Sequence, residues 1–118
     1  MATATISASM VYQNGTLQVP LAVGSFSITL SGTHYVHNIQ TMAITTAAAL
    51  NMGGVTSAGY GVFINRDATN IITIGKTGAS DVVSLKPGEV ACFRLGTNAP
   101  YAVALVSACD LEYLIVSA

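Results

Sequence analysis

The feature that most limits how this chain can fold is an alternation of apolar and polar residues with a period of two, repeated in short runs. In "GSFSITLSG", Phe26, Ile28 and Leu30 alternate with serine and threonine residues. Successive side chains of a strand point to opposite faces, so this run predicts a strand with one dry face and one hydroxyl face. Similar runs recur almost to the C-terminus, and residues 60–64, 72–74, 90–95 and 101–107 are examples.

Turn residues separate these runs and predict how the strands connect. Asn14-Gly15 stands between two alternating runs, and it predicts a hairpin with a type I′ turn because both residues accept positive φ. Pro20 follows in the returning run and cannot donate to a ladder, so we expect an edge or bulged strand there. Pro87-Gly88 fits the central positions of a type II turn.

One segment departs from the strand pattern. Residues 47–52, after Thr45 or Thr46 as N-cap and before Gly53, form the only plausible helix, although a loop is an equal alternative. Short strands punctuated by Gly, Asn and Pro, with no linker or repeat, predict an all-β fold with at most one short helix. We expect one antiparallel β-sandwich or jelly roll domain over residues 1–118.

The chain carries very little charge. Hydrophobic residues make up 52% of it and charged residues 8%, against about 25% charged residues in ordinary soluble domains. Either a small compact protein has a hydroxyl-rich surface, or much of that surface is covered in an oligomer or lattice, where interface cores lack charge. The second interpretation is favoured and predicts a homo-oligomer, with a trimer as the expected form.

The same composition argues against several classes of partner. No run approaches the roughly 20 apolar residues of a spanning helix, so no membrane association is expected. The net charge is −1 without a basic cluster, so nucleic acid is not an expected partner. "MATATISASM" lacks the basic and apolar regions of a secretory signal, and we therefore expect Cys92 and Cys109 to be buried free thiols rather than a disulfide.

The stretch "GYGVFINRDATNIITIGKT" (residues 59–77) contains the densest group of functional side chains. Gly75-Lys76-Thr77 resembles the end of a phosphate-binding loop, but Asn70 stands where the first glycine belongs and four β-branched residues follow it. Asn and Asp cap their own backbone in turns. We therefore expect a hairpin loop that contacts a neighbouring subunit through Asn65, Arg66, Asp67, Thr69 and Asn70.

The remaining candidates are weak as chemistry. His34 and His37 lie three apart in an extended segment, on opposite faces and without an acidic or Cys neighbour, so no metal pair is expected. The chain has no G-x-S-x-G motif, and we expect neither an enzyme nor a cofactor. The five tyrosines are expected in the core or at interfaces. A glycan site at His34, Tyr35 and His37 is the alternative.

A resemblance covers roughly residues 59–117. The strings "GYGVFINRDATNIITIG", "LKPGE", "FRL", "APYAVA" and "LEYLIV" resemble small β-rich virion structural proteins of tailed bacteriophages. Such proteins are similar to decoration or cement proteins of phage heads and to neck and tail components. The resemblance therefore implies a context, the phage particle, rather than a reaction.

The expected function follows from the low charge and the resemblance together. We expect an auxiliary structural protein of a tailed-phage virion, most simply a decoration or cement protein that binds the capsid exterior and stabilises the shell. Its partners would be its own copies and the major capsid protein or other virion proteins, and it would be found in the virion and, during assembly, in the host cytoplasm. The alternatives are a neck, tail or fibre component, a glycan- or receptor-binding adhesin, and an enzyme with a dispersed site.

Overall fold

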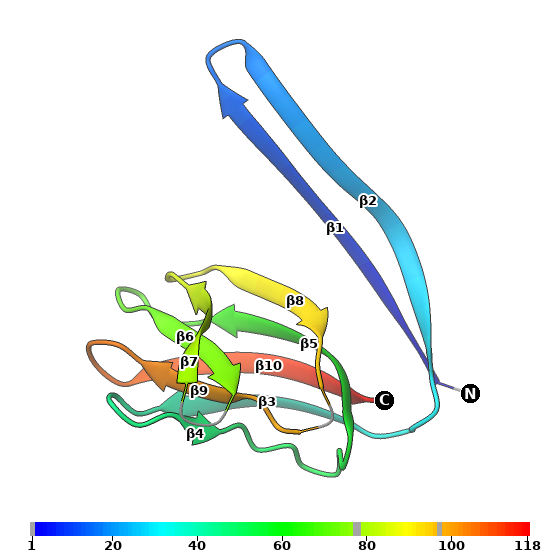
Figure 1. Ribbon diagram of the computed structural model, residues 1–118, viewed down its shortest axis with the longest axis vertical. Coiled ribbons are helices and arrows are strands. Elements are labelled where there is room, and N and C mark those ends of the chain that lie inside the picture. The colour runs from blue at the N-terminus through cyan, green and yellow to red at the C-terminus, as the bar shows by residue number, and fades with distance from the viewer. Residues whose placement is uncertain (1, 77–78, 97) are drawn as a thin grey trace. The chain divides into compact units, whose positions relative to one another are not determined.

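The chain forms two units of very different kinds. The computed structural model describes residues 2–76, 79–96 and 98–118. Residues 2–31 make a long two-stranded hairpin, here called the arm, and Gly32–Ala118 make a compact β-sandwich (Figure 1). The sandwich expected over residues 1–118 thus occupies residues 32–118, because within the described part of the chain the strands of the arm pair only with each other.

The arm consists of β1 (Ala2–Asn14) and β2 (Leu17–Leu30), paired antiparallel. Its turn is not the expected type I′. Asn14 pairs with Leu17 and ends β1, and Gly15 is the turn residue with positive φ (60°), which is the pattern of a type II′ turn with glycine in the first central position. The expectation for Pro20 is confirmed, because β2 has β1 as its one partner strand.

The sandwich contains two four-stranded antiparallel sheets among the described residues (Figure 1). One sheet has the strand order β3-β10-β5-β8 and consists of β3 (Tyr35–Met42), β10 (Cys109–Ser117), β5 (Ala58–Asn65) and β8 (Val90–Arg94). The other sheet has the strand order β4-β9-β6-β7 and consists of β4 (Ala48–Ala49), β9 (Tyr101–Ala104), β6 (Ile72–Lys76) and β7 (Ala79–Leu85). This order is that of a jelly roll, so the expected all-β fold is confirmed.

The core lies between the two sheets. Tyr113 and Phe63 are its largest buried side chains, and Phe63 stacks on Phe93 with ring centroids 5.1 Å apart. The small residues Ala102 and Ala104 of β9 are fully buried, as their apolar run predicts, and they let the second sheet approach closely. The Tyr113 hydroxyl reaches polar partners, since it donates to the main-chain oxygen of Asn51 at 2.7 Å.

Among the connections that cross from one sheet to the other, two are hydrogen-bonded to each other at one end of the sandwich. Residues 66–71 join β5 to β6, and residues 86–89 join β7 to β8. The prediction of a hairpin between residues 60–64 and 72–74 is therefore wrong, because these strands belong to different sheets. The type II turn is confirmed: Gly88 has φ 79°, and the Glu89 N–H donates to the Lys86 oxygen at 3.0 Å.

The predicted helix over residues 47–52 does not form. Ala48–Ala49 instead make the short edge strand β4, and the Leu50 N–H donates to the Pro100 oxygen at 3.0 Å. Leu50 is buried in the core while its neighbours are exposed. Packing of one leucine and pairing with β9 thus override a weak helical preference.

Candidate functional site: the loop after β5 and the outer face of its sheet

Asn65 is the centre of the loop that the sequence singles out, and its side chain is fully buried. Its amide nitrogen donates to the main-chain oxygens of Asn70 (2.8 Å) and Leu85 (2.9 Å), and its side-chain oxygen accepts from the Asp67 N–H at 2.9 Å. The Asn65 backbone also bonds Glu89 and Gly88. One asparagine therefore ties the β5–β6 and β7–β8 connections together, which is a structural role.

Asp67 stabilises the loop from its exposed side. Its carboxylate accepts hydrogen bonds from the N–H groups of Thr69 (3.0 Å) and Asn70 (2.7 Å). These main-chain bonds hold the pKa of Asp67 below its ordinary value. Asn70 in turn donates to the Ser107 hydroxyl at 2.8 Å. The turn chemistry expected of Asp67, Thr69 and Asn70 is thus present, although it closes a crossover.

Arg66 points away from the loop and joins it to a second predicted group. Its Nε donates to Glu112 Oε1 at 2.6 Å, and Glu112 Oε2 lies 2.7 Å from His37 Nε2. The hydrogen bonds from His37 and Arg66 hold the pKa of Glu112 below its ordinary value. Glu112 lies on the outer face of β10, between the buried Leu111 and Tyr113, and it links two groups of residues that the sequence could not connect.

Of the three residues of the alternative glycan site, the structure places Tyr35 and His37 on one strand face and His34 outside that strand. Tyr35 and His37 are two residues apart in β3 and share its outer face, and Tyr35 is 68% exposed. His34 precedes the strand, and its main-chain N–H donates to the Ser117 hydroxyl at 3.2 Å. Among the described residues, no three His, Cys, Asp or Glu side chains lie close enough to hold a metal ion.

The apolar residues that alternate along residues 60–64 lie on the outer face of sheet β3-β10-β5-β8. Tyr60, Val62 and Ile64 point outward, because the inward positions of β5 are taken by Gly61, Phe63 and Asn65. Of the tyrosines expected in the core or at interfaces, Tyr113 lies in the core, whereas Tyr12 and Tyr35 are exposed.

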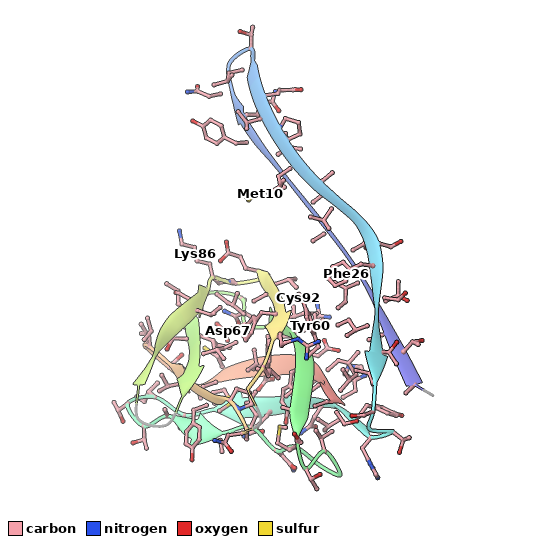
Figure 2. The ribbon with its side chains drawn as sticks, turned by 45° about the vertical axis from the view of Figure 1, so that its right-hand side comes forward. Met10, Phe26, Tyr60, Asp67, Lys86 and Cys92 are labelled. Carbon is pink, nitrogen blue, oxygen red and sulfur yellow. The ribbon has the colours of Figure 1, made fainter. Side chains whose placement is uncertain are left out.

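The two cysteines also differ in their exposure to solvent. Cys109 is buried as expected, whereas Cys92 is exposed on β8, and both are free thiols. Figure 2 labels Tyr60 and Cys92, which belong to the neighbouring strands β5 and β8. Partial burial raises the pKa of the Cys92 thiol and of the Tyr60 hydroxyl. Arg94 lies over the Tyr60 ring, 5.9 Å from its centroid.

The outer face of this sheet is a broad apolar surface, which sequence reasoning missed. Strand register places the following side chains in adjacent rows across its four strands: Ile39, Leu114, Val116, Tyr60, Val62, Ile64, Val90 and Cys92. A shallow pocket of about 220 Å³ opens among them beside His37 and Glu112. The signal was present in β10, where residues 113–116 are consecutive apolar residues, as in a strand covered on both faces.

Other chemistry finds little support in the described part of the chain. Ile72–Lys76 form strand β6, so the Gly-Lys sequence there is extended and does not form an anion-binding loop, while Thr77 lies outside the described residues. No helix among the described residues is long and apolar enough to cross a membrane. No protein-family model, curated protein or solved structure matches this chain.

Proposed function

We propose that this protein is an auxiliary structural protein of a tailed-phage virion, most simply a decoration or cement protein that binds the capsid exterior as a homo-oligomer, with a trimer favoured. The observation that carries the proposal is the apolar outer face of sheet β3-β10-β5-β8. This face belongs to a sheet whose other side is already packed in the core. A sheet that is apolar on both sides is typical of one that is covered on both sides.

The polar groups at this face suit recognition of a second surface. Arg66, Glu112 and His37 form one hydrogen-bonded row beside the apolar side chains. Each of these groups already has a partner, so its orientation is set before binding and little side-chain entropy is lost. An apolar centre with a polar edge is the usual composition of a protein interface.

The phage context comes from the sequence resemblance over residues 59–117, a range that contains strands β6 to β10 and all of β5 except its first residue. The jelly roll agrees with that context without establishing it, because the same architecture serves viral capsid proteins, lectins and other classes. In the proposed mechanism the outer face docks on the shell lattice. Binding to the assembled shell and not to separated subunits then stabilises the shell by mass action.

Co-sedimentation with purified shells that lack the protein tests this proposal. Wild-type protein should pellet with the shells and raise their melting temperature. Leu114→Gln, on the outer face, should weaken pelleting, whereas Leu105→Gln should not; the two leucines are 40% and 53% exposed, and Leu105 lies in the loop after β9. Failure of the wild-type protein to pellet, together with an unchanged shell melting temperature, would exclude the cement function.

A glycan-binding adhesin is the second candidate, and one observation favours it. Tyr35 is largely exposed beside His37 on β3, and an exposed aromatic ring can stack on the apolar face of a sugar. A glycan array probed with wild-type protein and with Tyr35→Ala separates the two candidates. Glycan binding that disappears in the variant supports the adhesin, and the absence of glycan binding excludes it.

A further inference from the structure

The arm has one continuous apolar face. In its register Met10 lies opposite Leu21 and Tyr12 lies opposite Val19, so these four side chains share a face. Met10 is 71% exposed and Leu21 is 67% exposed, and Met10 is labelled on the arm in Figure 2. A two-stranded ribbon has no second layer of its own, and such ribbons are only marginally stable alone in water.

A β-bulge keeps this face continuous along the arm. The apolar residues of β2 change from odd positions, ending at Val23, to even positions, beginning at Phe26. The register shift between Ile6 and Ala8 inserts one extra residue in β2 at this point, so Phe26 pairs with Ile6 and returns to the face of Val23. Without the bulge, the apolar residues of β2 would be divided between the two faces.

The opposite face of the arm is mostly polar. It carries Ser9, Gln13 and Gln18 near the turn, and the hydroxyls of Thr5 and Ser27 are hydrogen-bonded at 3.3 Å nearer the other end. Val11 and Pro20 are its largest apolar residues. This difference between the two faces is expected if one face is covered and the other is left in water.

The charge pattern selects the kind of surface that covers the apolar face. Residues 1–33 contain no Asp, Glu, Lys, Arg or His, so the arm can neither pair nor neutralise a charge on its partner. A charged partner surface would lose hydration without gaining a counter-charge. The same face of another arm is apolar, uncharged and of equal length, and it meets these requirements.

The available area agrees with a specific contact. A large apolar side chain carries roughly 60 to 120 Å² of apolar surface. Six such residues of the arm are 48% to 71% exposed, namely Met10, Tyr12, Leu17, Val19, Leu21 and Val23. They offer roughly 200 to 400 Å² per copy, which matches the apolar part of the smaller specific interfaces, at about 600 Å² per partner.

We propose that the apolar face of the arm is covered by the same face of the arm in a second copy of this chain. The contact uses the same face on both copies and therefore joins chains in pairs, whereas the proposed virion function favours a trimer; it concerns assembly of the free protein and does not rest on shell binding. Shell binding uses the outer face of sheet β3-β10-β5-β8, whereas assembly uses the arm. A variant that loses the contact between arms can therefore still be tested for shell binding, and a variant that loses shell binding can still be tested for assembly.

Light scattering of the full chain provides the first test. Wild-type protein at micromolar concentration should have a mass at least twice the 12.1 kDa of one chain. Met10→Thr with Leu21→Thr keeps a good strand-forming residue at both positions and should raise the dissociation constant by about tenfold or more. Val11→Thr with Ala22→Thr changes the opposite face and should leave the mass unchanged, and circular dichroism should show that both variants are folded.

Chemical cross-linking identifies which surfaces meet. Ala8 lies at the middle of β1 on the apolar face, so it stays near its counterpart whether two arms run parallel or antiparallel. In a Cys92→Ser background, Ala8→Cys should give covalent dimers with a short bismaleimide, whereas Ser9→Cys, on the opposite face, should give far fewer. A monomeric wild-type protein at 100 micromolar, or an oligomer whose Ala8→Cys variant does not cross-link, would overturn the proposal.

Discussion

The side-chain amide of Asn65 donates a hydrogen bond of 2.9 Å to the main-chain oxygen of Leu85, although the two residues lie in different sheets. Asn65 ends β5 and Leu85 ends β7, and the chain crosses between the sheets after each of them. The bond therefore fixes both crossovers with one buried side chain. It explains why a stretch that resembles an active-site loop is in fact part of the framework.

Replacing Asn65 by Ala should destabilise the sandwich strongly. The change leaves the Asn70 and Leu85 oxygens and the Asp67 N–H without their partner, and we expect a loss of about 2 to 4 kcal/mol in the free energy of unfolding. Asn38→Ala is the control, because Asn38 donates a single side-chain bond, to the Tyr113 hydroxyl at 3.3 Å, and should cost about 1 kcal/mol. Equal urea midpoints for the two variants would contradict the role given to Asn65.

Stability should fall in acid partly through Glu112. Its pKa is lower in the folded protein than the ordinary glutamate value of about 4.3, because His37 and Arg66 donate to it. A carboxylate with a lowered pKa contributes stability above its unfolded pKa and loses that contribution as the pH falls through the folded value. Glu112→Gln should thus have a lower melting temperature than the wild type at pH 7. Between roughly pH 5 and pH 3, the melting temperature of the variant should fall by less than that of the wild type.

Asp67 provides the comparison for this titration. Its pKa is lowered as well, but by the main-chain N–H groups of Thr69 and Asn70. Glu112→Gln should therefore keep the part of the acid sensitivity that comes from Asp67. Melting curves that shift in parallel at every pH for wild type and Glu112→Gln would count against the hydrogen-bonded row of Arg66, Glu112 and His37.

Gly88→Ala should destabilise the protein through backbone strain alone. Gly88 has φ 79°, and a Cβ placed there would meet no atom within 4 Å. A non-glycine residue in this left-handed conformation costs about 1 to 2 kcal/mol. Gly96→Ala is the matched control, because Gly96 also has open space around it but has no positive φ. This variant should leave the free energy of unfolding almost unchanged. Denaturant titration of both variants decides whether the type II turn is needed.

The two thiols should react at different rates. Cys92 is exposed and Cys109 is buried, so an aromatic disulfide reagent should modify one thiol per native chain and the second only after unfolding. Because Cys92 lies on the outer face of sheet β3-β10-β5-β8, shell binding should slow its modification. Unchanged reactivity of Cys92 in shell-bound protein would show that a different surface docks.

The local pattern of residues predicted many elements correctly. Alternation predicted the strands that contain Phe26 and Phe93, and Pro87-Gly88 predicted a turn that the structure contains. These features depend on near neighbours in the chain, since side-chain direction alternates along a strand and a type II turn needs a residue that accepts positive φ. Asp67 and Asn70 were identified as turn residues for the same reason.

Which strands pair with each other, and which strand faces are buried, depended on the whole fold. Periodicity showed that Tyr60, Val62 and Ile64 share a face but could not tell which face enters the core. Phe63 and Asn65 enter it instead, and Asn65 reaches Leu85, 20 residues away.

The sequence by itself determined that the chain is built from short antiparallel strands with specified turns, because those preferences are local. Only the tertiary structure decided that residues 2–31 pair as a separate unit, that β5 and β6 belong to different sheets, and that Glu112 meets both Arg66 and His37. The physical reason is that strand pairing and burial are set by competition among all the segments for one core.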